Sequence, residues 1–179
     1  NAKQFKELTA LFSKTALKVC EGQQYDIDFE TRTDVSIPEY LKMIEYKTAV
    51  LVAAAMQMGA IVAEASMENQ QKCYDFGRNL GIAFQLQDDF LDAFGDPKTF
   101  GKQVGGDIIE NKKTYLYLKA MALGSESDKR KLKTLYGKNS VHSDEKIATV
   151  LQVFEQTGAA EATNQAIQDY TKAAFEVLN

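Results

Sequence analysis

The chain has 179 residues, of which 45% are hydrophobic and 26% are charged, a balance typical of a globular protein with a sizeable core. Its formal net charge is −4 at pH 7, so the chain has no excess of basic residues of the kind that binds nucleic acid. The most apolar stretch, between Lys47 and Glu64, is interrupted by Gln57 and Gly59 and is shorter than the roughly 20 residues of a membrane-spanning helix. We therefore expect a single domain over residues 1–179, without a membrane span or a nucleic-acid partner.

The two cysteines, Cys20 and Cys73, show no pattern that would pair them, and no secretory signal is visible. Since disulfides are typical of oxidising compartments, we expect reduced thiols and a cytoplasmic protein. The first residue is Asn1 rather than Met, and helical periodicity begins at once. We interpret the chain as part of a longer protein.

Apolar residues follow helical spacing almost throughout, and no stretch alternates with the period of a strand. The first helix is predicted to end at Gly22, and a polar connection is predicted over 23–37. Ser36 and Glu39 have the spacing of a capping box, which predicts a long helix from there to about Ala63. The apolar face predicted for the first helix consists of Leu8, Leu11, Phe12, Ala16 and Val19.

The remaining apolar spacing predicts a helix over 68–94, a loop rich in Gly and Lys over 98–106, and a helix over 107–121. A short helix and two further helices complete the chain, and Ser143 is the N-cap candidate of the first of these two. The sequence therefore predicts an all-α protein.

Three aspartates gather near the end of the helix predicted over 68–94. Asp88, Asp89 and Asp92 fall within an arc of about 100° on that helix. Like charges repel, and the negative end of the helix dipole adds to the cost, so a cation is expected to compensate. Carboxylate oxygens suit Mg²⁺, particularly when a diphosphate supplies further ligands. The alternative is a solvated acidic face, although the surrounding residues are largely apolar.

Two lysines could hold an anion. Lys102 lies in the glycine-rich segment 101–106, where the backbone can approach a ligand closely, but the spacing is not that of a nucleotide-binding P-loop. The alternative is an ordinary surface loop. Lys47, followed by Thr48, begins the most apolar stretch, so its ammonium either extends to water or points into a cleft. The only histidine, His142, lies in a polar loop and is given no catalytic role.

These segments together resemble the motifs of the trans-isoprenyl diphosphate synthases, in the same order along the chain. Phe84-Gln85, followed by Asp88-Asp89-Phe90-Leu91-Asp92, is similar to the second aspartate-rich motif of the farnesyl and geranylgeranyl types. The other similar segments are Gly22–Asp26 (the glycine–glutamine segment), Tyr46–Ala49 (the lysine–threonine pair), Phe94–Pro97, Gly101-Lys102, Gly105–Ile108 and Asn111-Lys112.

The resemblance implies an all-α isoprenoid synthase helical bundle, here lacking its N-terminal helices. It also implies a Mg²⁺-dependent prenyl transferase that condenses isopentenyl diphosphate head-to-tail with an allylic diphosphate. The family is typically homodimeric, and segments 8–19 and 40–63 are the interface candidates. Asp88-Asp89 is the only Asp-Asp pair, so the first aspartate-rich motif has no counterpart. We therefore expect this chain alone to be inactive.

The resemblance also assigns roles to single residues. Asp88 would contact the metal directly. Asp89 and Asp92 would act through a metal-bound water, or would position the metal ligands without contacting the metal. Lys47 and Lys102 would grip the allylic diphosphate. Lys112 would lie near the diphosphate, although Lys113 competes for that position. Thr48 and Gln85 would place oxygens beside the carbocation and provide a route for its proton. Gln23 and Asp26 would orient the lysines, and Phe84 would bind substrate.

Three other interpretations remain open. A non-catalytic subunit of a heteromeric prenyl transferase would keep the fold and lose motifs, whereas the second aspartate motif is intact here. A terpene cyclase also uses metal and diphosphate, but its usual Asn/Ser/Glu-type second motif is absent from the sequence. A helical interaction module would bind neither Mg²⁺ nor diphosphate, so a binding measurement separates it from the enzymes.

Overall fold

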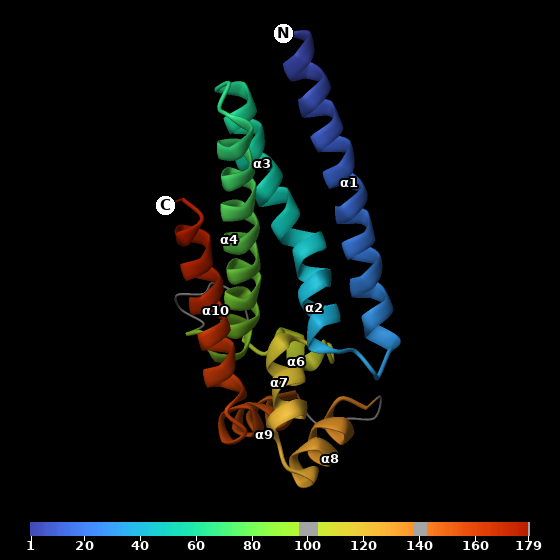
Figure 1. The fold of residues 1–179 in the computed structure, drawn as a ribbon. Coiled ribbons are helices and arrows are strands. Elements are labelled where there is room, and N and C mark those ends of the chain that lie inside the picture. The colour runs from blue at the N-terminus through green and yellow to red at the C-terminus, as the bar shows by residue number, and fades with distance from the viewer. Residues whose placement is uncertain (97–103, 138–142, 179) are drawn as a thin grey trace. The chain divides into compact units, whose positions relative to one another are not determined.

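The computed structural model of the chain describes residues 1–96, 104–137 and 143–178. All regular elements in these ranges are helices (Figure 1), which confirms the all-α prediction. None of these helices is long and apolar enough to cross a membrane. The helices are α1 (Ala2–Thr31), α2 (Ile37–Ile44), α3 (Val50–Val62), α4 (Met67–Phe94), α6 (Gly106–Ile109), α7 (Tyr115–Leu123), α8 (Glu126–Leu135), α9 (Ser143–Gln156) and α10 (Ala159–Glu176), with a π-helical segment η1 (Glu45–Ala49) between α2 and α3.

The chain divides into two compact units. Unit 1 contains Asn1–Asp28, Leu41–Gln85 and Ile167–Asn179, and unit 2 contains Phe29–Tyr40 and Leu86–Ala166. Helices α1, α2, α4 and α10 contribute residues to both units. The organisation of 1–179 as a single domain stays a prediction.

Helix α1 is longer than the sequence predicts. It continues through Gly22 to Thr31, so the predicted end at Gly22 and the connection predicted over 23–37 are wrong. Gly22 is buried, and a Cβ at this position would lie 2.3 Å from the backbone nitrogen of Lys47. The glycine therefore marks a close backbone approach rather than a helix end.

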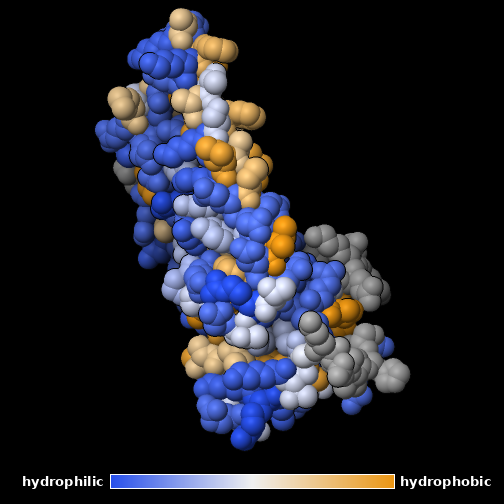
Figure 2. Space-filling model, turned by 90° about the vertical axis from the view of Figure 1, so that its right-hand side faces the viewer, coloured by the Kyte–Doolittle hydropathy of each residue, from blue (hydrophilic) through white to orange (hydrophobic). Residues whose placement is uncertain are grey.

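One face of α1 is both apolar and exposed. Phe12, a member of the predicted apolar face, is 64% exposed. Thr15 is buried, and its Oγ1 donates to Leu11 O at 2.8 Å. Figure 2 shows hydrophobic patches between hydrophilic ones on the face seen from the right of Figure 1. The other exposed large apolar residues of α1 are Phe5 (73%), Leu17 (67%) and Ile27 (57%).

The long helix predicted from Ser36 to Ala63 is confirmed at its ends and interrupted in the middle. Ser36 N donates to Glu39 Oε2 at 2.9 Å, and Glu39 N donates to Ser36 Oγ at 3.4 Å, which completes the predicted capping box. The last helical residue is Val62. Between them, Glu45–Ala49 winds as a π-helix, a form found mostly as single turns and often at functional sites.

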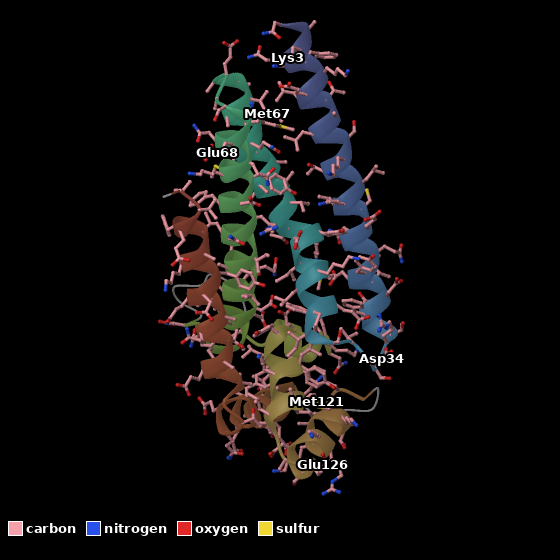
Figure 3. All side chains as sticks on the ribbon, viewed as in Figure 1. Lys3, Asp34, Met67, Glu68, Met121 and Glu126 are labelled. Atoms are coloured by element: carbon pink, nitrogen blue, oxygen red, sulfur yellow. The ribbon has the colours of Figure 1, made fainter. Side chains whose placement is uncertain are left out.

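Helix α4 confirms the prediction over 68–94. It begins at Met67, labelled in Figure 3 next to Glu68, and ends at Phe94. Gly95 N donates back to Leu91 O at 2.8 Å and closes the last turn. One continuous helix therefore carries the three aspartates and Gln85, as the sequence predicts.

The helix predicted over 107–121 consists of two helices. Helix α6 ends at Ile109 and α7 begins at Tyr115. Between them Asn111 has a φ of 59°, a left-handed conformation that asparagine adopts more readily than most residues. Lys146, only 3% exposed, donates from Nζ to Asn111 Oδ1 at 2.6 Å. Periodicity along the chain carries no information about this distant partner, which is why the break was not predicted.

Unit 2 has its own hydrophobic core, to which helices α6, α7, α8 and α9 contribute. Gly105 precedes α6 with a φ of 86°, and a Cβ there would lie 2.7 Å from Ile147 Cδ1. Glycine is favoured at this position by its conformation, because side chains rarely tolerate that φ. The most buried apolar side chains of these four helices are Ile108, Leu116, Leu132, Val150, Val153 and Phe154.

Candidate active site

The three aspartates at the end of α4 have different surroundings within unit 2. Asp89 is 6% exposed and accepts a short hydrogen bond at Oδ2 from the hydroxyl of Tyr40, which is itself 3% exposed. Burial, and then the nearby Asp89 carboxylate, raise the pKa of Tyr40 well above its ordinary value, so Tyr40 is the donor. Asp89 is therefore tied to the start of α2 inside the unit.

Asp92 holds the turn that leads into α6. Its carboxylate oxygen Oδ2 accepts from the backbone nitrogen of Asp107 at 3.0 Å, and its carbonyl oxygen accepts from Gly105 N at 2.6 Å. A Cβ on Gly106 would lie 3.2 Å from Asp92 Oδ1. Burial raises the pKa of the Asp92 carboxyl above its ordinary value, against the bond from Asp107 N, which lowers it.

Asp88 is half-buried on the same helix. Within the described ranges, no three His, Cys, Asp or Glu side chains form a group that could hold a metal ion. This finding does not conflict with Mg²⁺, which is usually bound by one or two carboxylates together with substrate phosphates and water. Asp88 and Asp92 lie one helical turn apart and supply such a pair. Asp89 fits this role less well, because it is buried as well as bonded to Tyr40.

Replacing Tyr40 by phenylalanine is expected to lower the free energy of unfolding by about 1–3 kcal/mol, because the buried Asp89 carboxylate loses its phenolic donor. Urea denaturation of an active protein that contains this chain would measure the change. Tyr74→Phe is the control, since the described structure shows no hydrogen bond to that partly buried hydroxyl. Equal stability of the two variants would show that the Tyr40–Asp89 bond contributes nothing.

The contacts of Lys112 and Lys113 separate the two candidates for one position. Lys112 Nζ lies 2.9 Å from Asp107 Oδ1 and 2.9 Å from Glu110 Oε2, next to the turn that Asp92 holds. Lys113 Nζ instead donates to the carbonyl oxygens of Phe29 at 2.8 Å and Glu30 at 3.2 Å, in the last turn of α1. A lysine there satisfies helix carbonyls that lack a partner. The contacts therefore place Lys112, and not Lys113, beside the turn that follows the aspartates.

Two residues of the π-helical segment in unit 1 form polar contacts with neighbouring helices. Lys47 Nζ lies 2.6 Å from Asp26 Oδ2, with side chains 33% and 31% exposed. Thr48 Oγ1 donates to Gln85 Oε1 at 2.9 Å. The structure thus brings Lys47 to Asp26, and Thr48 to Gln85, as expected if Asp26 orients the lysine and the two oxygens act together.

Two of the other predicted site residues are exposed. Gln23 is exposed on α1, and Phe84 is 64% exposed on α4. Lys102 and His142 lie outside the described residues. The roles of Gln23, Phe84 and Lys102 stay predictions.

Sequence reasoning missed the residues that support the site. Tyr40 and Lys146 carry no motif, and their partners are far away in sequence. Lys146 Nζ also lies 5.3 Å from the ring centroid of Tyr136, a cation–π contact. Asn111, which the sequence placed inside a helix, could have been recognised as a turn residue, because asparagine favours left-handed backbone.

The comparisons with known proteins show which family the chain resembles. The polyprenyl synthetase family model matches residues 1–154. The chain is 39% identical, over 179 residues, to a short chain isoprenyl diphosphate synthase of Methanothermobacter thermautotrophicus, covering 99% of this chain and 54% of that protein. It is 38% identical, over 169 residues, to a geranylgeranyl diphosphate synthase of Sulfolobus acidocaldarius, covering 94% of this chain and 51% of that protein.

Solved structures give the same result. A crystal structure of a geranylgeranyl pyrophosphate synthase superimposes with a TM-score of 0.93 at 54% identity, covering 99% of this chain and 55% of that chain. The geranylgeranyl pyrophosphate synthetase of Pyrococcus horikoshii gives 0.91 at 31% identity, covering 99% and 54%. The chain spans about half the length of the relatives it matches. Because the family model covers most of the sequence and relatives of one kind cover nearly all of it, this chain belongs to the polyprenyl synthetase family.

Proposed function

We propose that the protein containing this chain is a prenyl transferase, which condenses isopentenyl diphosphate head-to-tail with an allylic diphosphate. The observation that carries the proposal is the similarity, across 99% of the chain, to a short chain isoprenyl diphosphate synthase. In the reaction the allylic C–O bond breaks first and releases diphosphate, the alkene of isopentenyl diphosphate attacks the carbocation, and a proton then leaves. The protein must therefore stabilise a departing anion and a cation in turn.

Lys47 and Asp26 serve the first step in this proposal. Breaking the C–O bond places negative charge on the leaving diphosphate, and a lysine ammonium suits phosphate oxygens. Asp26, at 2.6 Å from Lys47 Nζ, keeps that side chain in one orientation. Lys112 and Lys102 are proposed to supply further positive charge to diphosphate.

Thr48 and Gln85 serve the later steps. Each presents a neutral oxygen, and the hydrogen bond of 2.9 Å between them holds both in place. Neutral oxygen dipoles stabilise a carbocation without forming a bond to it, and they can pass a proton from the condensed product toward the leaving diphosphate.

Mg²⁺ is the proposed cofactor. Asp88 and Asp92 would hold it, because one or two carboxylates with substrate oxygens meet its preferences. When bound, it supplies Lewis-acid neutralisation of the diphosphate charge. Asp89, bonded to Tyr40, instead keeps the end of α4 in position.

A homodimer in the cytoplasm is the proposed state of the protein. Exposed apolar side chains on α1, with Phe12 at 64% and Leu17 at 67%, are typical of a surface that meets another protein. Both lie in the segment 8–19 predicted as an interface. Cys20 and Cys73 are free thiols, which agrees with a reducing compartment.

The test is product analysis with an active protein that contains this chain, given isopentenyl diphosphate, an allylic diphosphate and Mg²⁺. The proposal expects allylic diphosphates lengthened by whole isoprene units. Cyclised hydrocarbons without lengthening would support a terpene cyclase instead. Substrate binding without turnover would support a non-catalytic subunit, and no binding of Mg²⁺–diphosphate would support an interaction module.

Replacing Lys47 by alanine is expected to raise the KM for the allylic diphosphate roughly 10- to 100-fold. This factor corresponds to the binding free energy of one hydrogen bond to a charged group. Steady-state kinetics at saturating isopentenyl diphosphate would measure the effect. Lys14→Ala, an exposed lysine of α1, is the matched control and should keep the original KM. Equal values for both variants would remove Lys47 from the substrate site.

A further inference from the structure

The π-helical segment η1, which carries Lys47 and Thr48, is enclosed in unit 1 by two glycines. A Cβ on Gly22 of α1 would lie 2.3 Å from Lys47 N and 2.7 Å from the carbonyl carbon of Tyr46. On α4, a Cβ on Gly81 would lie 2.6 Å from Ala49 Cα. Both glycines are buried. Backbone atoms obstruct both positions, so no rotation of a side chain could make room.

The π turn is not explained by its own residues. Its sequence, Glu-Tyr-Lys-Thr-Ala, contains neither proline nor glycine, and an α-helical turn is the usual geometry for such a segment. Its geometry must therefore be imposed by neighbouring elements.

Helix α1 supplies several of those neighbours along one face. Besides Gly22, Asp26 pairs with Lys47, and the ring of Tyr25 lies 6.4 Å from that of Tyr46, centroid to centroid. Lys18 Nζ lies 5.1 Å from the Tyr46 ring centroid. These α1 residues recur at helical spacing, so the distance between α1 and η1 affects all of these contacts together.

We propose that Gly22 and Gly81 are positioning residues for the reaction, an inference that rests on the proposed function. Neither glycine would touch substrate. By letting two helix backbones close on η1, they fix where its backbone lies, and thereby where the Lys47 ammonium and the Thr48 hydroxyl are held. A methyl group at either position pushes η1 away by a distance that reacting groups do not tolerate.

A third glycine separates positioning from ordinary packing. Gly77 lies on α4, one turn before Gly81, and a Cβ there would lie 2.8 Å from Ala53 Cα. The obstruction is again a backbone, but it belongs to α3 rather than to η1. Gly59 provides the neutral case, since nothing lies within 4 Å of a Cβ added there.

The experiment compares Gly22→Ala, Gly81→Ala, Gly77→Ala and Gly59→Ala in an active protein that contains this chain. Melting temperature and steady-state kinetics with the allylic diphosphate are measured for each. Gly22→Ala and Gly81→Ala should lower kcat/KM by about 10- to 100-fold. Gly77→Ala should lower the melting temperature but keep kcat/KM within about threefold. Gly59→Ala should keep kcat/KM and should not lower the melting temperature, because alanine favours a helix interior over glycine.

A second measurement tests whether Gly22 acts through Lys47. If it does, the activity losses of Gly22→Ala and Lys47→Ala should not multiply in the double variant, because the first substitution has already displaced the lysine. Multiplying losses would overturn the proposal for Gly22.

Other outcomes would overturn the whole proposal. One is a loss of kcat/KM in Gly77→Ala as large as that in Gly22→Ala and Gly81→Ala. Another is unchanged kinetics in both Gly22→Ala and Gly81→Ala. If both of these variants fail to fold while Gly77→Ala folds, the glycines have a purely structural role. Absence of prenyl transfer in the unaltered protein would instead refute the proposed function. The same assay separates the two failures, because it includes the unaltered protein beside the variants.

Discussion

Replacing Asp88 by alanine in an active protein that contains this chain is expected to abolish Mg²⁺-dependent binding of the allylic diphosphate, with turnover falling about a hundredfold or more. Asp88 is one of the two carboxylates proposed to hold Mg²⁺, and it lies one helical turn from Asp92 on α4. Removing it takes one hard oxygen ligand from a site that is proposed to need only two. The helical fold should remain, because Asp88 is only half-buried.

Calorimetric titration of diphosphate with and without Mg²⁺, together with initial rates over a range of Mg²⁺ concentrations, would measure the effect. Circular dichroism would check that the helices are retained. Asp75→Ala, on the same helix and half-buried, is the matched control. Unchanged turnover with unchanged Mg²⁺ dependence in Asp88→Ala would refute the metal assignment.

The same arrangement predicts an order among the three aspartates. Asp92→Asn keeps an oxygen that can accept from Asp107 N, so its effect on turnover should be smaller than that of Asp88→Ala. Asp89→Asn should act mainly on stability, because its environment is a buried hydrogen bond from Tyr40. Helical spacing alone treats the three as one acidic face. The resemblance assigns the direct metal contact to Asp88, and the hydrogen-bond partners separate Asp89 from Asp92.

Features determined by neighbouring residues could be predicted from the sequence. The capping box of Ser36 and Glu39 needs residues three positions apart, and the apolar spacing of α4 is continuous from Met67 to Phe94. Features determined by distant contacts could not. Gly22 is typical of a helix end, yet α1 passes through it. The residue is glycine because the backbone of Lys47 lies against it.

The functional residues divide in the same way. The lysine–threonine pair and the aspartate motif each lie within one short segment, so their spacing is visible in the sequence. Lys146, whose ammonium is buried against Asn111 and Tyr136, lies 35 residues from the turn it supports. No local signal marks such a residue, since a lysine on a helix is usually exposed.

The 179-residue chain on its own is expected not to catalyse prenyl transfer. The resemblance implies a reaction that requires two aspartate-rich motifs, and Asp88-Asp89 is the only Asp-Asp pair in the sequence. The family's basic residues for isopentenyl diphosphate are also without a counterpart, so both substrates would lack part of their binding groups. The relatives that the chain matches along 99% of its length are about twice as long.

Exposed apolar residues support the same expectation. Phe84 is 64% exposed directly beside Gln85, and Leu51 of α3 is 59% exposed. Large exposed apolar side chains are typical of surfaces that another protein or a ligand covers. A carbocation that water can reach is lost to hydrolysis, so lengthened products should not accumulate in a site left open to water.

The measurement is an assay of the chain after its intact mass has been verified, with isopentenyl diphosphate, an allylic diphosphate and Mg²⁺. Product formation should not exceed the rate without enzyme, whereas a longer active protein that contains this chain should give lengthened diphosphates under the same conditions. Circular dichroism should show that the isolated chain is helical, so that inactivity is not caused by unfolding. Sustained formation of farnesyl or longer diphosphates by the verified chain would mean that one aspartate motif suffices, and would overturn this account of the metal and substrate sites.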